Sequence, residues 1–260
     1  PITPELLRTE KGFVRLIKKQ QKELETLKKK HNKERSLMQK QHCTIVDRMV
    51  AIHDKEKMAQ EKTLEKAIKK KGERNCNDLK SETEDKLQTL VNSHKEKVKE
   101  MVSDQTREWS EMVSRQMTEE HCLKKEHIVQ QSTLLQQLME EAHANQLKEM
   151  ELRQERENKD LKTRQAKQSM EACKAVMSDK TVKNKAERDR RVRELNENNT
   201  KKFIEERKRQ AMLQQRLKDN LTKLHQEQME SLLKSNEREV EMVDMVHEEA
   251  KLASKPETVV

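Results

Sequence analysis

Glycine, proline and aromatic residues are almost absent from this 260-residue sequence. It contains two Gly, three Pro, one Trp, two Phe and no Tyr. Turns between β-strands depend on Gly and Pro, and strands are enriched in aromatic residues, so this scarcity excludes a β-sheet protein. Hydrophobic residues make up only 31% of the chain, too few for a single globular core of this length. Phosphate-binding loops need clustered glycines, whereas Gly12 and Gly72 lie far apart.

Long hydrophobic runs and paired cysteines are also missing. No apolar run approaches the ~18 residues that a membrane-spanning helix needs, and no signal peptide is visible. The four cysteines, at positions 43, 76, 122 and 173, form no CxxC motif, which predicts reduced thiols in a cytoplasmic protein. The chain begins with Pro1 rather than Met, so we expect it to be a fragment of a larger protein.

Charged residues make up 40% of the chain, with 57 Lys and Arg against 48 Asp and Glu. Low hydrophobicity with high charge is also typical of intrinsic disorder. The mixture of both signs, and apolar residues that recur at helical spacing, favour long helices instead. About half of the residues are Ala, Glu, Lys, Leu or Arg, a composition typical of coiled coils.

Two breaks divide the sequence into three predicted helices. Gly72 can adopt the left-handed conformation that ends a helix, and Asn77 or Asp78 can cap the next helix. The second break offers three capping residues, Ser178, Asp179 and Thr181. We expect helices over about 5–71, 78–177 and 180–250, and a tail over 251–260, in a single elongated helical domain.

Apolar residues repeat every seven positions in these helices, as in a coiled coil. The first line contains Ile17, Leu24, His31, Met38, Ile45 and Ile52, and the third contains Phe203, Gln210, Leu217 and Leu224. Polar residues interrupt both seams, so three helices alone leave apolar surface exposed. The predicted fold is therefore all-α, with three very long helices that form an elongated antiparallel coiled-coil rod and pair as a homodimer.

No catalytic, cofactor-binding or metal-binding constellation is visible. The nine histidines look scattered, and we interpret them as seam or solvent residues. His121 and His127 are six residues apart and point to different sides of a helix, which disfavours a zinc pair. Trp109 is interpreted as a core residue. We therefore predict that this segment is not an enzyme and holds no cofactor of its own.

The charge is unevenly distributed along the chain. Residues 1–75 carry 21 basic and 11 acidic residues (net +10), and residues 180–218 carry 14 and 6 (net +8). Residues 76–179 carry 17 basic and 21 acidic residues (net −4). The first and third helices are therefore predicted to attract an anionic surface, with little stacking on single-stranded nucleic acid because aromatics are rare. Pairing with Glu on neighbouring helices is the alternative for the basic residues beside the seam.

Three stretches resemble the distal C-terminal domain of the phospholipase C-β family. They are KKQQKELETLKKKHNKERSLMQKQHCT (18–44), LEKAIKKKGERNCNDLKSETE (64–84) and KAERDRRVRELNENNTKKFIEERKRQAM (185–212). The string NENNTKKFIEERKR and the link KKKG…NC are the most specific parts. The resemblance is collinear, covers nearly the whole chain and weakens after about Leu224.

This resemblance implies a regulatory role within a larger enzyme. The family hydrolyses phosphatidylinositol bisphosphate with calcium in a catalytic barrel, and this chain has no counterpart of the catalytic His or the calcium-binding acids. The C-terminal extension of the family dimerises, binds activated Gα of the Gq class, accelerates GTP hydrolysis by that protein and associates with anionic membrane. The resemblance thus implies a cytoplasmic protein at the inner plasma membrane, with the nucleus as a further compartment.

The predicted membrane-binding and Gα-binding residues are basic. The resemblance maps the basic residues of the family onto Lys18, Lys22, Lys29, Lys33, Lys201, Lys202, Lys208 and Arg209. The charge pattern adds Arg15, Lys40 and Arg216. We call these eleven residues the basic set.

Two alternatives to the regulatory role remain. Asn184 precedes an arginine cluster that runs to Leu195, as in a basic-zipper DNA-binding protein. A passive structural coiled coil is the second alternative.

The end of the sequence carries a separate motif. Thr258 and Val260 fit a PDZ ligand, since the Val carboxylate can bind backbone amides. An arbitrary boundary at Val260 is the alternative to that motif.

Overall fold

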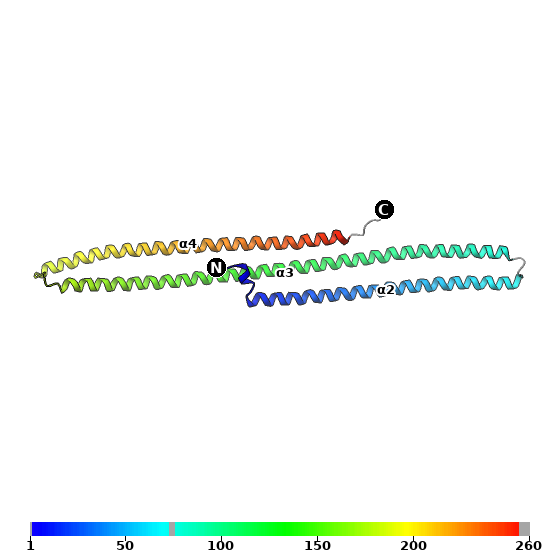
Figure 1. Ribbon diagram of the computed structural model, residues 1–260, viewed down its shortest axis with the longest axis horizontal. Coiled ribbons are helices and arrows are strands. Elements are labelled where there is room, and N and C mark those ends of the chain that lie inside the picture. The colour runs from blue at the N-terminus through cyan, green and yellow to red at the C-terminus, as the bar shows by residue number, and fades with distance from the viewer. Residues whose placement is uncertain (1, 73–75, 255–260) are drawn as a thin grey trace. The chain divides into compact units, whose positions relative to one another are not determined.

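The computed structural model describes residues 2–72 and 76–254. Within them the chain forms only helices: a short helix α1 (Pro4–Leu7), then α2 (Lys11–Lys71), α3 (Asn77–Met177) and α4 (Lys185–Ser254) (Figure 1). Hydrogen bonds join later positions of α2 to earlier positions of α3, so these two helices are antiparallel. The hydrogen bonds between α3 and α4 show the same order. The prediction of an all-α fold with three very long antiparallel helices is confirmed.

The contacts divide the chain into two compact units, where the sequence predicted one helical domain. Unit 1 comprises Pro1–Leu16 and Ile128–Glu239, and unit 2 comprises Ile17–His127 and Val240–Val260. Unit 1 pairs the second part of α3 with most of α4 and includes α1. Unit 2 pairs most of α2 with the first part of α3 and includes the end of α4.

The first predicted helix, 5–71, is interrupted by a turn after Leu7, so this prediction was wrong at its start. Thr3 caps α1 by accepting a hydrogen bond from the Leu6 amide at 3.3 Å, and the Thr9 hydroxyl then donates to the Leu6 carbonyl at 2.6 Å. In a continuous helix, Leu7 and Phe13 would point roughly 120° apart. Both are buried in unit 1, and the turn between α1 and α2 permits this.

The break after α2 follows the sequence prediction. Gly72 has a φ of 74°, and Lys69, Lys70 and Lys71 occupy the last turn of α2, where the helix dipole favours cations. α3 then begins at Asn77, so Cys76 occupies the capping position and the predicted caps, Asn77 and Asp78, were wrong. The Cys76 carbonyl accepts from the Lys80 amide, and its thiol donates to the Gly72 carbonyl at 2.9 Å.

The break before α4 is longer than predicted, since α4 begins at Lys185 and not at 180. The Asp179 carboxylate accepts two hydrogen bonds from Thr181, and the backbone bond is the main reason that the pKa of Asp179 is lowered. Asn184 caps α4, because its side-chain oxygen accepts from the Ala186 amide at 3.1 Å. The predicted caps Ser178, Asp179 and Thr181 were therefore wrong: Ser178 donates back to the Lys174 carbonyl of α3, and Asp179 accepts from Thr181.

In unit 2, polar side chains on facing helices form layers that recur every eleven residues. The α2 members are Gln20, His31, His42 and His53, and the α3 members opposite them are His127, Gln116, Gln105 and His94. In three of these layers a Gln side chain donates to the backbone carbonyl of the opposite His, at 3.0 to 3.2 Å. In the fourth, the two imidazole rings stack with centroids 4.0 Å apart.

The pairing of α3 with α4 follows the same step. In unit 1 the layers are Gln165 with Phe203, Gln154 with Gln214, and His143 with His225. In unit 2, His121 of α3 stacks on His247 of α4, and these positions fit the same step of eleven. An eleven-residue repeat corresponds to about 3.67 residues per turn, against 3.5 for a heptad.

The heptad lines predicted from the sequence were therefore wrong over part of their length. Ile45 and Ile52 in α2 are 45% and 58% exposed, and Leu217 and Leu224 in α4 are 47% and 46% exposed. A heptad line drifts away from an eleven-residue seam by several residues over a helix of this length. Polar residues such as Gln214 and His225 fill the seam instead.

Candidate functional site

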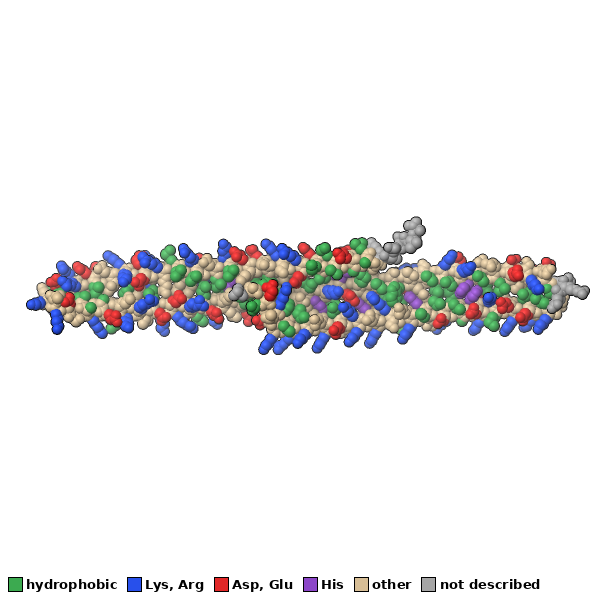
Figure 2. Space-filling model, in the orientation of Figure 1, with side chains coloured by type: hydrophobic (Ala, Val, Ile, Leu, Met, Phe, Trp, Pro, Cys, Tyr) green, Lys and Arg blue, Asp and Glu red, His purple; other side chains and the backbone are tan. Residues whose placement is uncertain are grey.

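The basic set lies on the outer surfaces of α2 and α4. All eleven side chains are exposed. The layer positions explain this, because a residue two positions away lies about 200° around the helix. Lys18 and Lys22 flank Gln20 in this way, and Lys29 and Lys33 flank His31. Figure 2 shows Lys and Arg side chains projecting in a row along the edge of α2 and along α4.

On α4 the same reasoning places Lys201 two residues before Phe203 and Arg216 two residues after Gln214. The three remaining members on this helix, Lys202, Lys208 and Arg209, are also exposed. On α2, Arg15 and Lys40 complete the set. The structure therefore brings the predicted residues together as two outward-facing rows, one on each helix.

Ion pairing within the chain does not account for these residues. Among the described residues, Lys208 is the one member of the basic set in an ion pair, with Glu205 one turn away at 3.9 Å. Exposed pairs of this kind contribute little. Pairing with Glu on a neighbouring helix, the alternative predicted for the residues beside the seam, is therefore not observed for the basic set.

Other cations make the interhelical ion pairs. Arg115 of α3 bonds Glu34 of α2 at 2.7 Å and Glu119 of its own helix at 2.8 Å. The hydrogen bond from Arg115 is the main cause that lowers the pKa of Glu34. The pKa of Glu119 is also lowered, first by its hydrogen bond with His31 and then by Arg115. The cations that hold unit 2 together are thus distinct from the basic set.

The histidines were missed as a group by the sequence reasoning, although a signal was present. All nine lie on four eleven-residue series: His31, His42 and His53 on α2; His94 and His127 on α3; His121 and His143 on a second series of α3; and His225 and His247 on α4. A search for polar residues at steps of eleven would have found them. They look scattered only when the chain is read in steps of seven.

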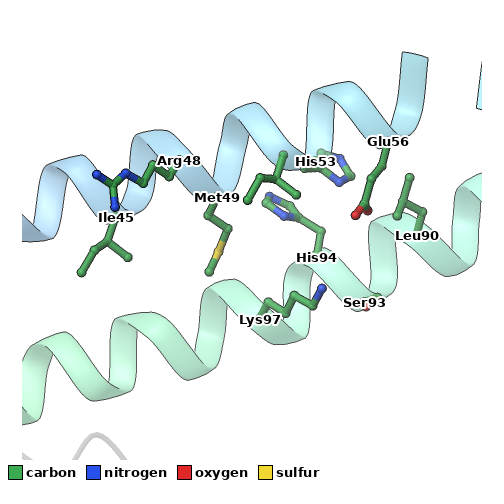
Figure 3. A pocket seen from close by; sticks show the side chains of 10 residues that line it. Ile45, Arg48, Met49, His53, Glu56, Leu90, Ser93, His94 and Lys97 are labelled. Carbon is green, nitrogen blue, oxygen red and sulfur yellow. The ribbon is translucent and has the colours of Figure 1, made fainter. Parts of the chain in front are cut away.

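One groove between α2 and α3 in unit 2 is lined by Ile45, Met49 and Leu90 beside the stacked rings of His53 and His94 (Figure 3). Its volume is about 350 Å³. The Nδ1 atom of His53 is buried without a hydrogen-bond partner. Ser93 also lines the groove, but among the described residues no hydrogen bond joins its hydroxyl to either imidazole, as an activated nucleophile would require.

Metal-binding and membrane-spanning features were sought among residues 2–72 and 76–254. No group of three His, Cys, Asp or Glu side chains there is arranged to hold a metal ion. No helix in the same residues is long and apolar enough to cross a bilayer. His121 and His127 face different helices, since His121 bonds Asp244 of α4 and His127 bonds Glu23 of α2. The predicted PDZ residues, Thr258 and Val260, lie outside the described residues.

Comparison with known proteins gives a consistent result. No protein-family profile matches the sequence. The 1-phosphatidylinositol 4,5-bisphosphate phosphodiesterase beta-4 of Rattus norvegicus is 53% identical over 98% of this chain, which spans 22% of the length of that relative. The chain thus covers about a fifth of such a curated relative.

Solved structures agree with the sequence relative. The C-terminal domain of the Drosophila phospholipase NORPA is 34% identical, with a TM-score of 0.54 over 94% of this chain and 97% of that domain. A complex of INAD PDZ45 with NORPA CC-PBM contains a chain that is 28% identical, with a TM-score of 0.55 over 100% of this chain and 96% of that chain. The chain therefore belongs to the phospholipase C-β family, in which it corresponds to the C-terminal coiled-coil domain.

Proposed function

We propose that this domain is a regulatory module whose basic set associates with an anionic membrane surface. The observation that carries the proposal is the exposure of all eleven basic side chains, ten of them without an ion pair to the described residues. Each basic residue near an anionic leaflet contributes about 1 kcal/mol of attraction. Several such residues in one row are enough to hold a peripheral protein at the surface.

The family relationship supports a wider role. We propose that the whole protein hydrolyses phosphatidylinositol 4,5-bisphosphate in a calcium-dependent catalytic domain outside this chain. In the same proposal, the C-terminal domain binds activated Gα of the Gq class and accelerates its GTP hydrolysis in signal transduction. The site of action is then the inner plasma membrane, with the nucleus as a further compartment.

Homodimerisation is part of the proposal because α4 keeps an apolar face outside its seam. Leu213, Leu217 and Leu224 are exposed on this helix while polar Gln214 and His225 are buried beside them. A second copy of the chain would cover these leucines. Sedimentation at micromolar concentration should report a dimer, and replacing the three leucines with Glu should shift the chain to a monomer.

The test of membrane association uses the charge pattern directly. Lys18, Lys22, Lys201 and Lys208 are reversed to Glu in one variant, and binding to vesicles that contain phosphatidylserine is measured by co-sedimentation. We expect weaker binding with unchanged helicity, because exposed charges contribute little to folding. Unchanged binding by this variant, both at low salt and in 0.5 M salt (roughly a 4–5 Å Debye length), would show that the basic set is passive.

A matched control separates position from net charge. Lys86, Lys95, Lys162 and Lys167 of α3 are also exposed, so reversing them makes the same change in net charge elsewhere. This control should retain most vesicle binding. Equal loss in both variants would mean that net charge alone drives binding.

The structure favours this function over a basic zipper. Asn184, which the zipper interpretation places in a DNA-reading helix, instead caps the start of α4. Arg188 donates to the Val182 carbonyl, and Arg191 pairs with Glu187 at 3.5 Å, so part of the arginine cluster is used locally. A passive coiled coil, the other alternative, predicts no vesicle binding at all.

A PDZ protein is a second proposed partner. The structure of NORPA CC-PBM with INAD PDZ45 supports it, since that chain resembles this one over its full length. A peptide with the sequence of residues 254–260, SKPETVV, should bind a PDZ domain through its terminal carboxylate and lose binding on Val260→Asp. Equal binding by the altered peptide would remove the idea.

A further inference from the structure

The histidine layers are of two kinds. In the first kind, one imidazole faces a carboxylate of the opposite helix: His31 with Glu119 and Glu120, His42 with Glu108, and His127 with Glu23. In the second kind, two imidazoles stack across the seam: His53 on His94, His121 on His247, and His143 on His225. A proton adds a favourable charge to the first kind and a repulsive one to the second, and His121 combines both because it also bonds Asp244.

The His143–His225 layer of unit 1 is built for two neutral rings. The ring centroids are 3.8 Å apart and the planes are inclined by 9°. His143 Nε2 donates to Gln228 Oε1, and His225 Nε2 donates to Gln146 Oε1, both at 2.8 Å. Each helix thus supplies a His and, three residues later, a Gln. Since an amide oxygen can only accept, each ring carries its hydrogen on Nε2 and is satisfied without a charge.

No carboxylate in the described part of unit 1 bonds either ring. Both imidazoles are buried, at 8% and 7% exposure. The nearest charged side chains along α3 (Glu140, Glu141 and Lys148) and along α4 (Lys223 and Glu227) are exposed. On α1, Glu5 is exposed and Arg8 pairs with Glu239 at 3.0 Å. Burial, and secondly the neighbouring His143, lower the pKa of His225.

The other two stacks have acidic neighbours. His121 bonds the Asp244 carboxylate at 3.1 Å, and Lys125 also pairs with Asp244. Burial, then His121 and Lys251, lower the pKa of His247, while Glu248 and Asp244 raise it. Around His53 and His94, the groove is lined by Arg48, Lys97 and Glu56 (Figure 3). Of the three stacks in the described residues, the His143–His225 layer is the one in which each ring bonds an amide oxygen.

We propose that the His143–His225 layer is a proton-sensitive latch that loosens the pairing of α3 with α4 in unit 1 when the pH falls below about 6.5. The second proton places two positive rings 3.8 Å apart in a buried layer. Separation of the helices relieves that repulsion and hydrates both rings. The layers of His31, His42 and His127 in unit 2 resist the same acidification, because a protonated ring there meets a carboxylate of the opposite helix.

The direction of the effect follows from linkage. A histidine with a lowered pKa in the folded state binds fewer protons than it does when unfolded, so the stability it contributes is present above about pH 6.5. That stability is lost progressively as the pH falls toward the lowered value. α4 carries five members of the basic set, so loosening of the α3–α4 pairing would also change their positions relative to a membrane surface. This consequence rests on the proposed function, whereas the latch does not.

The experiment is hydrogen exchange of the whole chain at pH 7.0 and 5.5, with EDTA present and with rates corrected for the intrinsic pH dependence of exchange. Peptides from 135–160 and 210–235 should lose protection at pH 5.5. The loss should be about tenfold for each unit by which the pKa of the second protonation is lowered in the folded layer. Peptides from 20–45 and 105–120, which contain the carboxylate-paired layers of His31 and His42, should keep their protection. Unchanged protection in unit 1, or an equal loss in peptides 20–45 and 105–120, would overturn the proposal.

A matched variant tests the two imidazoles themselves. Replacing both with Gln (His143→Gln with His225→Gln) imitates the Gln154–Gln214 layer one repeat away, so the variant should fold and lose the pH response of unit 1. His42→Gln removes a histidine from unit 2 and should leave that response intact. A double variant that responds like the parent chain would refute the latch.

If the double variant does not fold, the parent chain supplies a second readout. Titration of histidine Cε1–H signals by NMR should show coupled titration of the His143 and His225 rings, with a second step below the ordinary value of about 6.5. Single-residue His→Gln variants assign these signals to His143 and His225. Two independent titrations near 6.5, without spectral change in unit 1, would overturn the proposal.

Discussion

The two units differ in how many hydrophobic side chains they bury. The buried hydrophobic residues of unit 1 are Leu7, Phe13, Leu135, Met139, Leu161, Val182 and Leu232. In the described part of unit 2 they are Cys76 and Met112. Both units also bury polar side chains: His143, Gln165, Gln214, His225 and Asn236 in unit 1, and Gln20, His31, Thr83, Gln116 and His127 in unit 2. Apolar burial therefore contributes more to unit 1, whereas unit 2 depends more on the hydrogen bonds and ion pairs of its polar layers.

This difference means that the two units should fail under different conditions. Apolar burial is insensitive to pH, whereas carboxylate–imidazole contacts are not. At neutral pH we expect unit 1 to resist denaturant better, since it buries more apolar surface. In weak acid, protonation of the His143–His225 layer should reduce the difference in denaturant resistance between unit 1 and unit 2.

Removing the most buried side chain of unit 1 should have the largest effect. Met139 is 0% exposed, and Met139→Ala should lower the free energy of unfolding of unit 1 by about 2–5 kcal/mol. Met170→Ala, on the same helix and 61% exposed, is the matched control and should cost less than about 0.5 kcal/mol. Urea titration followed by hydrogen exchange of unit 1 peptides measures both. Equal costs would contradict the placement of the seam.

Unit 2 should be most sensitive at a buried glutamine. Gln116 is 1% exposed, donates to the His31 carbonyl and accepts a hydrogen bond from Arg35 at 2.7 Å. Gln116→Ala leaves the Arg35 guanidinium without this acceptor, so we expect a loss of about 1–3 kcal/mol. The fluorescence of Trp109, the single tryptophan, reports unfolding of unit 2. Gln39→Ala, at an exposed position of α2, is the control. A similar loss of unfolding free energy in this control would show that the buried Gln116 layer does not stabilise unit 2.

The acid response of the His31 layer in unit 2 should be smaller and should occur at lower pH. The pKa of Glu119 is lowered by its hydrogen bonds with His31 and Arg115, so its contribution is present above the unfolded value of about 4.3. That contribution is lost as the pH falls through the lowered folded value. Because the carboxylate is 35% exposed, screening limits it to about 0–1 kcal/mol. In Glu119→Gln, the unfolding midpoint followed by Trp109 fluorescence should depend less on pH between pH 5 and 3. An unaltered pH dependence would show that Glu119 does not contribute to the acid response.

The smallest effect is expected at the surface pair of Arg8 and Glu239 in unit 1. Their side chains are 40% and 37% exposed, and the contact is 3.0 Å. A double-mutant cycle with Arg8→Ala and Glu239→Ala should give a coupling of about 0–1 kcal/mol. A coupling above this range would mean that the ion pair, and not burial of Leu7, anchors α1.

Much of the helical fold could be predicted from the sequence. Composition excluded sheets, Gly72 marked the first break, and the charge map predicted that the first and third helices are basic. These features depend on local propensity and on periodicity, which a single sequence displays. The family resemblance, carried by the string NENNTKKFIEERKR, is confirmed by the relatives.

The seam could not be read correctly because two periods compete. His31 lies on both the seven-residue and the eleven-residue line, and the heptad line through it is the more apolar of the two. Hydrophobicity thus predicted Ile45 and Ile52 as seam residues. In the structure His42 and His53 lie in the seam, where Gln105 donates to the His42 carbonyl and the His94 ring stacks on His53. Such partners lie 40 or more positions away in the sequence, so a local pattern does not reveal them.

The register of the eleven-residue layers is the central claim, because it decides which residues face inward and leaves the basic set outside. It can be tested by cross-linking in a variant whose four native cysteines are replaced. One variant carries Gln154→Cys with Gln214→Cys, two positions whose side chains bond across the seam. A second carries Gln154→Cys with Leu217→Cys, which places the partner on the heptad line.

A disulfide forms readily only when the two Cα atoms are about 4.4–6.8 Å apart. Mild oxidation, with the intramolecular product identified by mass, should therefore cross-link the 154–214 pair rapidly and the 154–217 pair slowly. Faster cross-linking of the 154–217 pair would restore the heptad seam and contradict the eleven-residue register.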